Sequence, residues 1–350
     1  MKKFMKIDLI DLNLPLEHRF SISRGSTDEV QTLFVRVSDQ GIEGWGEAAA
    51  VKYKGQSRGS MRKSLELASH RLESMTPVEL IEEWEDFVIP HLGSSGAMAG
   101  LNMAIWDWKS KREGISLKEL WGSKEELTPV TSFTIGIDTP EVMAKKVVEA
   151  QRYPVLKVKL GFKGDVEVFE MLQAVGPQHQ WRVDVNGGWT LEEALLKSKK
   201  LEAMGVEMIE QPMQFSNPED LKKIQGSLSI PIYLDESVDG IQDLERYQGV
   251  VGGVNLKLTK IGSLSGLRQA IFRAKELGFQ VMLGCMTCSS LHISGIIPLA
   301  SFADALDLDG SLLLKRDPFS GLKLTHQGRF RVNAGVGCGL EFDSRKLESL

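Results

Sequence analysis

The sequence is poor in cysteine, with only Cys285, Cys288 and Cys338 among 350 residues. A disulfide-stapled extracellular scaffold needs more cysteines spread along the chain, so that class is excluded and a cytoplasmic location is expected. Cys285 and Cys288 form a C-x-x-C pair, which can be a redox pair or half of a zinc site. The sequence offers no second C-x-x-C and no nearby pair of histidines, and therefore favours neither function.

Long apolar runs and basic clusters are also lacking. Lys6, Asp8 and Asp11 interrupt the start of the chain, so neither an export signal nor a membrane span is predicted. The net charge of -5 and the scattered Lys and Arg residues make nucleic acid and anionic membranes poor partners. A small-molecule substrate is the expected partner. A homo-oligomer is compatible with the sequence, which does not determine the oligomeric state.

The pattern of the chain changes twice. Residues 4–50 are typical of strands, with a polar loop over 21–26 and a tight turn over 41–47, and residues 60–114 are helical, with an apolar stripe ending at Trp108. After Pro129, eight β-rich runs alternate with helical stretches, which favours a closed parallel (β/α)8-type barrel and an α/β fold class. No G-x-G-x-x-G or G-x-x-x-x-G-K-[ST] motif supports a nucleotide-binding sheet. The predicted regions are 1–125 (α+β), 126–318 (barrel) and 319–350, which returns to the first region.

Acidic residues follow three successive runs at intervals of about one βα unit. They are Asp184, Glu210 and Asp235. Each alone is more typical of a helix cap or an ion pair. At the carboxyl ends of neighbouring barrel strands they would converge, repel one another and have raised pKa values unless a cation joined them. Oxygen ligands with room for water or a substrate oxygen favour Mg²⁺ over Zn²⁺.

Lysines flank these acids on both sides. Lys157 and Lys159 alternate with aliphatic residues, so both face one side of a strand, and Lys257 ends the run after Asp235. Lys159 and Lys257 would face each other across the barrel mouth. Lys157 and the cation would lower the pKa of Lys159 by like-charge repulsion, so that it could act as a base. Two bases on opposite faces of one carbon are typical of a racemase or epimerase.

These residues resemble the enolase superfamily, in its muconate lactonizing enzyme branch, over essentially the whole chain. The matching motifs are Lys157-Val158-Lys159, Asp184-Val185-Asn186, Glu210-Gln211-Pro212, Asp235-Glu236-Ser237 and Asn255-Leu256-Lys257. The resemblance implies that the first region and the C-terminal tail form a capping domain, and that Mg²⁺ works with the lysines.

Within the branch, the chain looks most like dipeptide epimerases. Asp307-Leu308-Asp309 resembles their D-x-D motif, which implies a clamp on the α-ammonium group of a dipeptide; helix capping is the alternative for this pair. The resemblance also implies that Thr134, Cys285 and Thr287 contact the substrate.

Arg24 lies in the predicted polar loop. Its side chain could be solvated there, or its forked guanidinium group could bind a carboxylate. Ser23-Arg24-Gly25 resembles the segment of L-Ala-D/L-Glu epimerases whose arginine holds the glutamyl carboxylate. This implies an acidic dipeptide substrate.

Other functions remain as alternatives. One is an epimerase of apolar or cationic dipeptides. A mandelate racemase-like dehydratase would need a histidine where Gly284-Cys285-Met286 stands, and His292 is expected in the next helix. An o-succinylbenzoate synthase would use the same lysines, but its substrate has no ammonium group for Asp307 and Asp309. A non-catalytic binding protein on the same scaffold is disfavoured, because unselected buried charges cost stability.

Overall fold

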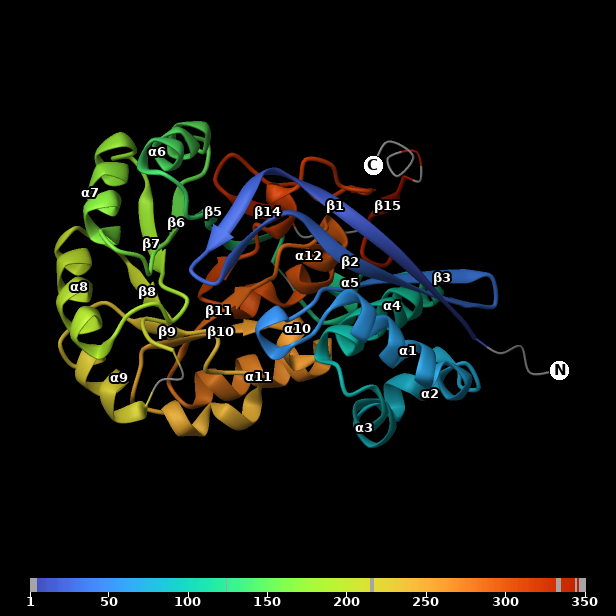
Figure 1. The fold of residues 1–350 in the computed structure, drawn as a ribbon. Coiled ribbons are helices and arrows are strands. Elements are labelled where there is room, and N and C mark those ends of the chain that lie inside the picture. Colours follow the sequence, from blue (N-terminus) through green and yellow to red (C-terminus); the bar gives the residue numbers. More distant parts are fainter. Residues whose placement is uncertain (1–4, 124, 215–216, 332–334, 344, 346–350) are drawn as a thin grey trace.

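The structure is a computed structural model that describes residues 5–123, 125–214, 217–331, 335–343 and 345. Residues 1–4, which belong to the segment where no export signal is predicted, lie outside the described residues. Figure 1 shows the barrel on the left and the N-terminal sheet with its helices on the right. None of the helices in the described ranges combines the length and the apolar character needed to cross a bilayer.

The chain begins with an antiparallel sheet of β1 (Lys6–Ile22), β2 (Gly25–Asp39) and β3 (Ile42–Ala48). The prediction of a polar loop over 21–26 is wrong in extent, because β1 and β2 pair as far as Ile22 and Gly25. Only Ser23 and Arg24 form the turn. The long hairpin reaches from the sheet to the barrel, so its tip belongs to the barrel mouth (Figure 1).

The predicted turn over 41–47 is mostly the strand β3. The tight turn lies at Gln40 and Gly41, whose φ angles are 51° and 80°. The later glycines serve close packing: a Cβ on Gly44 or Gly46 would lie 2.0 Å from a backbone oxygen of helix α4 (Ser95–Glu113). These glycines therefore allow α4 to lie directly against β3.

The apolar stripe of α4 is buried as predicted, with Leu101, Ile105 and Trp108 fully inaccessible to solvent. The helix begins after Ser94, whose hydroxyl caps Ala97, and ends at Gly114 in the left-handed conformation. The other helical segments of this region are η1 (Lys52–Lys54), α1 (Arg58–Leu72), α2 (Pro77–Glu82), η2 (Trp84–Val88), α3 (Ile89–Leu92) and α5 (Leu117–Leu120).

Eight parallel strands form the barrel in sequence order, which confirms the predicted fold class. Ser132 N donates to Leu306 O (3.1 Å) and Thr131 bridges to Leu306, so the first and last strands meet and the ring closes. The strands are β5 (Phe133–Ile135), β6 (Val155–Lys159), β7 (Gln180–Asp184), β8 (Met208–Glu210), β9 (Ile232–Leu234), β10 (Gly253–Lys257), β11 (Gln280–Gly284) and β12 (Ala305–Asp307).

The outer layer departs from an ideal barrel at two places. After β9 the chain makes only short turns, η3 (Ile241–Asp243) and η4 (Glu245–Tyr247), and after β12 it makes η6 (Gly310–Leu313) in place of a full helix. The other connections carry α6 (Pro140–Glu149), α7 (Asp165–Val175), α8 (Leu191–Ala203), α9 (Pro218–Gln225), α10 (Leu258–Ile261), α11 (Leu264–Glu276), α12 (Ser290–Ile296) and η5 (Ile297–Phe302).

The C-terminal segment contacts both parts of the molecule. β13 (Phe319–Ser320) pairs with β15 (Glu341–Phe342), and the Phe342 ring stacks on Trp45 of β3 with centroids 4.7 Å apart. β14 (Arg329–Arg331) instead pairs with β4 (Leu127–Val130), just before the barrel. Residues 332–334, 344 and 346–350 of the predicted third region lie outside the described residues, and the bounds 1–125, 126–318 and 319–350 stay a prediction.

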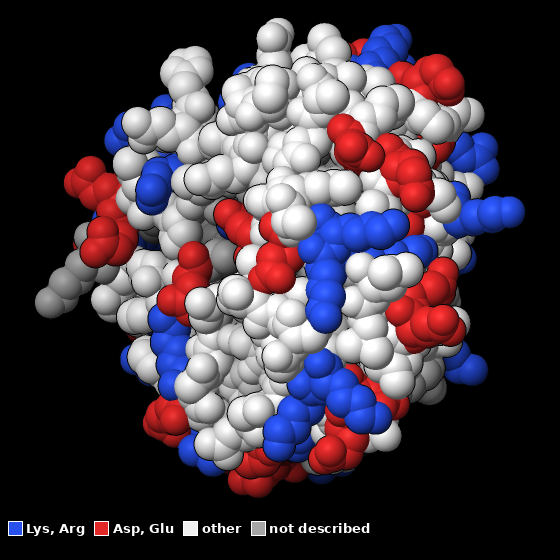
Figure 2. Space-filling model, turned by 90° about the vertical axis from the view of Figure 1, so that its left-hand side faces the viewer, with Lys and Arg blue, Asp and Glu red and all other residues white. Residues whose placement is uncertain are grey.

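Charged side chains of both signs are interspersed on the face that Figure 2 shows, and small groups of Lys and Arg lie next to Asp and Glu. This face lies on the barrel side of the molecule. Inside the barrel, Met208, Tyr233, Met282 and Ala305 form a small buried cluster of their own. Met208, Tyr233 and Ala305 each lie two residues before an acidic residue at the carboxyl end of a strand, so the cluster forms an apolar layer below a polar mouth.

Candidate active site

Polar side chains from five successive strands meet at the carboxyl end of the barrel. In the parallel register Lys159 lies beside Asp184, and Asp184 lies beside Glu210. The spacing of two residues turns both lysines of β6 into the barrel. The structure therefore brings together the predicted catalytic lysines, Lys159 and Lys257, the predicted substrate-binding Lys157, and the predicted metal ligands, which are Asp184, Glu210 and Asp235.

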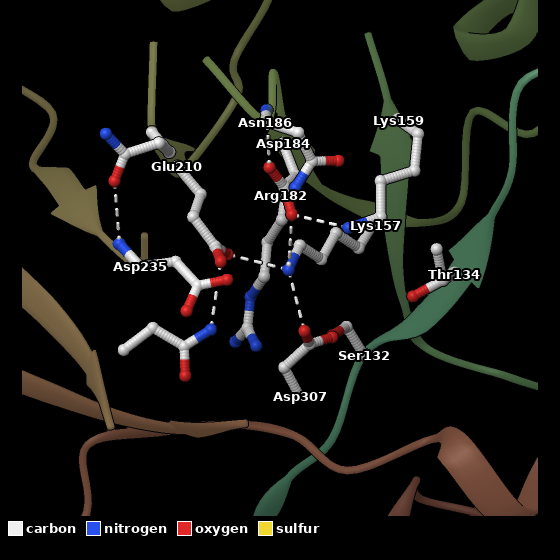
Figure 3. A network of polar contacts seen from close by, with 12 residues as sticks. Ser132, Thr134, Lys157, Lys159, Arg182, Asp184, Asn186, Glu210, Asp235 and Asp307 are labelled. Carbon is white, nitrogen blue, oxygen red and sulfur yellow. Dashed lines mark hydrogen bonds and ion pairs between the residues drawn. The ribbon is translucent and has the colours of Figure 1, made fainter. Parts of the chain in front are cut away.

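Lys157 occupies the centre of this group and is almost completely buried. Its Nζ lies 2.6 Å from Glu210, 2.6 Å from Asp307 and 3.0 Å from Asp184 (Figure 3). Three carboxylates thus surround one ammonium group. Its single positive charge offsets part of the negative charge that would otherwise be unpaired in the barrel interior.

The other two predicted lysines each contact one acid. Lys159 Nζ lies 2.6 Å from Asp184, and Lys257 Nζ lies 2.7 Å from Asp235. A further lysine, Lys260, was missed by the sequence reasoning: its buried Nζ donates to Asp235 Oδ1 (2.8 Å) and to the backbone oxygen of Asp235 (2.7 Å). The spacing of three residues after Lys257, at the start of a helix, is the signal that could have placed it beside the same acid.

The pKa values of the acids differ because their lysine partners differ. Burial opposes ionisation of Asp184, but Lys157 and Lys159 outweigh it and hold the pKa of Asp184 well below its usual value. Lys257 and Lys260 likewise lower the pKa of Asp235 against its burial. For Glu210, burial and the charge of Asp184 raise the pKa to about 7. The expectation of raised pKa values therefore holds for Glu210 and is wrong for the two aspartates.

The lowering of a lysine pKa was expected at Lys159 and stays a prediction, whereas two other lysines of the site, Lys157 and Lys257, have raised pKa values. Burial disfavours the charged form of Lys257, but the charges of Asp235 and Glu210 outweigh it and raise its pKa. The pKa of Lys157 is also raised, because Asp184, Asp307 and Glu210 outweigh burial. The physical reason is that carboxylates lie within about 3 Å of these ammonium groups and stabilise their charged form.

The acidic residues have the chemistry of a site for a hard divalent cation. All three are buried, all supply oxygen donors, and the charge of Asp235 disfavours ionisation of both Asp184 and Glu210, so the three interact. Within the described ranges, no three acidic, histidine or cysteine side chains are already arranged to hold a metal ion, and each of these acids contacts a lysine. The donor set fits the oxygen ligands that Mg²⁺ prefers.

The D-x-D pair lies at the end of β12, inside the barrel. Asp307 accepts hydrogen bonds from Lys157 Nζ (2.6 Å) and from Ser132 Oγ (2.6 Å). Asp309 accepts one from the backbone nitrogen of Thr134 (2.6 Å), and burial together with the charge of Asp307 raises its pKa to about 6. The pair thus joins the last strand to the first, and the predicted contact residue Thr134 lies beside it.

The predicted residues after β11 border the same mouth. Cys285 and Thr287 are half-buried, and Cys285 N donates to Asp307 O at 3.2 Å. Cys288 is fully buried against the chain at Gly310. His292 lies in α12, where Nδ1 is 3.3 Å from the Glu47 backbone oxygen. It therefore does not stand at the end of β11, as the dehydratase alternative would require.

Arg24 extends from the tip of the β1–β2 hairpin over the barrel mouth. It forms an ion pair with Glu236, the residue after Asp235, and Nη1 donates to the backbone oxygen of Asn186 at 3.4 Å. Its guanidinium carbon also lies 5.3 Å from the ring centroid of Tyr53. In this structure the carboxylate that Arg24 contacts belongs to the protein itself and is reached by one arm of the guanidinium, so the predicted contact with a substrate carboxylate stays a prediction.

Two family models match the chain. "Mandelate racemase / muconate lactonizing enzyme, N-terminal domain" covers residues 6–122, and "Enolase C-terminal domain-like" covers residues 141–346. The L-Ala-D/L-amino acid epimerase of a Maribacter species is 35% identical over 327 residues, which are 93% of this chain and 95% of that protein. The L-Ala-D/L-Glu epimerase of Bacteroides thetaiotaomicron is 33% identical over 342 residues, 96% of this chain and 88% of that protein.

A solved structure has a similar fold. The dipeptide epimerase of Methylococcus capsulatus, complexed with Mg and the dipeptide L-Arg-D-Lys, is 28% identical and has a TM-score of 0.88. The similarity covers 97% of this chain and 100% of that chain.

Proposed function

The chain belongs to the mandelate racemase and muconate lactonizing enzyme family of the enolase superfamily, and on that premise we propose that it is a Mg²⁺-dependent dipeptide epimerase. Its reaction class is that of an isomerase, as for its relatives. The proposed reaction inverts the α-carbon of the C-terminal residue of a dipeptide, with L-Ala-D/L-Glu as the favoured substrate.

The observation that carries the proposal is the placement of two lysines on opposite walls of the barrel. In the ring of eight strands, β6 with Lys159 and β10 with Lys257 are separated by β7, β8 and β9, which supply the three acids. A substrate carbon between the two amines would be open to one of them on each face. A reaction that removes or adds a proton on only one face of the carbon would need only one such amine.

The proposed reaction begins when one lysine, in its neutral form, removes the α-proton of the C-terminal residue, which leaves an enediolate. The opposite lysine, as an ammonium group, then delivers a proton from the other face, and the two lysines exchange roles in the reverse direction. A Mg²⁺ ion held by Asp184, Glu210 and Asp235 would supply Lewis-acid stabilisation of the charge that develops on the substrate carboxylate.

The remaining residues have binding roles in this proposal. Lys157, already surrounded by carboxylates, would meet the substrate's C-terminal carboxylate. Asp307 and Asp309 would hold the α-ammonium group, and the raised pKa of Asp309 favours a site that becomes fully charged when a cation arrives. Thr134, Cys285 and Thr287 would line the pocket that holds the dipeptide. Arg24 would receive a glutamyl side-chain carboxylate.

The test is proton NMR in D₂O, with Mg²⁺, over acidic, apolar and cationic dipeptides. We expect the α-proton of the C-terminal residue of L-Ala-L-Glu to exchange for deuterium and the D-Glu epimer to form. Absence of exchange with every dipeptide would refute the epimerase. Exchange with apolar dipeptides but not with acidic ones would refute only the proposed role of Arg24.

The two-lysine scheme has a separate test. Lys159→Ala and Lys257→Ala should each abolish epimerisation, while each variant keeps slow exchange from a single stereoisomer, because one face retains its base. Equal residual epimerisation in both variants would contradict the scheme.

The pairing of Arg24 with Glu236 favours a second candidate, an epimerase with a broader choice of dipeptides. Arg24 is already neutralised, so an apolar side chain at the C-terminal position would meet no uncompensated cation. The same panel of dipeptides separates the two candidates through the ratio of their kcat/KM values.

A further inference from the structure

Glu236 follows the acid Asp235 directly and contacts Arg24 of the hairpin, but it is not one of the proposed metal ligands. Its side chain is only 10% exposed, and Oε1 accepts hydrogen bonds from Arg24 and from Asn186 Nδ2 (3.1 Å). Its other oxygen, Oε2, is buried and has no hydrogen-bond partner among the described residues. The carboxylate therefore depends on Arg24 for its one full countercharge.

We propose that Glu236 is a specificity-determining residue that competes with the substrate for Arg24. This inference rests on the proposed function and adds a residue to it. A substrate carboxylate that takes Arg24 must displace Glu236 and leave a nearly buried negative charge without its cation. A neutral side chain leaves the Arg24–Glu236 pair intact.

The competition has a direct physical consequence for substrate choice. Arginine can bind one carboxylate with both arms of its fork, and a second carboxylate close by repels the first. The wild-type site therefore binds acidic dipeptides with a penalty, and its preference for them over apolar dipeptides is weaker than an unpaired arginine would give. Specificity here is the difference between two affinities, and Glu236 changes one of them.

The neighbouring loops contain a matched control for a nearby negative charge. Asp239, three residues further along the same loop, pairs with Lys54 at 2.7 Å, and no hydrogen bond or ion pair joins it to Arg24 among the described residues. Asp239→Asn removes one negative charge from the same part of the mouth. Glu236→Gln removes one that touches Arg24.

The experiment measures binding by calorimetry and kcat/KM by NMR for L-Ala-L-Glu and L-Ala-L-Leu at saturating Mg²⁺. For Glu236→Gln we expect the ratio of L-Ala-L-Glu to L-Ala-L-Leu to rise about tenfold, the effect of one charge-assisted hydrogen bond at a partly buried site. For Asp239→Asn we expect a change below about twofold. In an Arg24→Met background, Glu236→Gln should no longer change the ratio.

Three results would overturn the inference. The first is an unchanged or lowered ratio in Glu236→Gln, which would mean that Glu236 holds Arg24 ready for the substrate. The second is an equal rise of this ratio in Asp239→Asn, which would mean that the loss of any nearby negative charge causes the effect. The third is persistence of the effect without Arg24. In each case exchange by the wild type would still stand, whereas a wild type that exchanges neither dipeptide would refute the proposed function itself.

Discussion

Glu47 offers a stability prediction whose size follows from the structure. This glutamate of β3 is completely buried where the N-terminal sheet meets the barrel. Ser289, at the start of α12, donates to its Oε2 from N (2.9 Å) and Oγ (2.5 Å), and Thr32 Oγ1 donates to Oε1 (2.8 Å). Burial nevertheless raises the pKa of Glu47 to about 7, and the charge of Asp317 adds to the rise.

The sign of the pH dependence follows from this raised pKa. Between pH 4.5 and about 7 the folded protein keeps a proton on Glu47 that the unfolded chain has released. The stability that Glu47 contributes is therefore fully present below pH 4.5 and is lost as the pH rises through 7. A rise of this size corresponds to ~3 kcal/mol.

The neighbouring His292 acts in the opposite direction. Burial lowers its pKa to about 4, so its contribution is present above the unfolded pKa of 6.5 and is lost as the pH falls through 4. The two effects partly cancel in the wild type. Glu47→Gln keeps an acceptor for Ser289 and removes the titration of Glu47, while the contributions of His292 and of the other buried groups are the same in wild type and variant.

The assay is urea unfolding followed by tryptophan fluorescence from pH 4.5 to pH 8. We expect the difference in unfolding free energy between wild type and Glu47→Gln to change by ~3 kcal/mol across this range, with the wild type losing stability relative to the variant as the pH rises. The control is Glu170→Gln, at an exposed position of α7, where the difference should stay constant. A constant difference for Glu47→Gln as well would refute the reasoning.

Three further predictions concern the metal site and the packing of the cap. Removal of divalent ions with a chelator should stop α-proton exchange, and added Mg²⁺ should restore it; exchange that survives chelation would contradict the metal assignment. Lys260→Met removes two hydrogen bonds from Asp235, so the Mg²⁺ concentration for half-maximal activity should rise about 10- to 100-fold, and an unchanged Mg²⁺ titration would show that Lys260 is not needed there. Gly46→Ala places a Cβ 2.0 Å from the Gly100 oxygen and should lower the free energy of unfolding, measured by urea denaturation, by ~3 kcal/mol or more. Gly59→Ala, whose Cβ would have only Ser57 Oγ at 4.0 Å, should have little effect in the same assay.

Local sequence patterns predicted the strands of the barrel well because the strands are short and largely apolar, and several of them are bounded by a charged residue at the carboxyl end. Asp184 and Lys257 end their strands in the structure. The hairpin at Arg24 was harder to predict, since the polar residues that suggested a loop are held in strands by pairing between β1 and β2. Pairing partners lie outside any local window, so tertiary contacts decided that segment.

The glycine-rich segment 41–47 shows the same limit. Glycines predict turns through their conformational freedom, but Gly44 and Gly46 are in a strand because α4 lies against them. Lys260 was missed for a related reason. Its partner Asp235 lies on a different strand, and a lysine in a short helix carries no local sign that it is buried.

The sequence by itself predicted the eight-strand barrel and the set of lysines and acids at its mouth, because these depend on periodicity and on residues at regular intervals along the chain, and its motifs carried the resemblance to the family. Only the tertiary structure decided how those charges are paired. It placed Lys157 among three carboxylates and raised its pKa, where neighbouring lysines had suggested a lowered pKa for Lys159. It also gave Arg24 a partner in Glu236. The physical reason is that electrostatic energies depend on distances of a few ångströms between side chains, and sequence spacing does not give those distances.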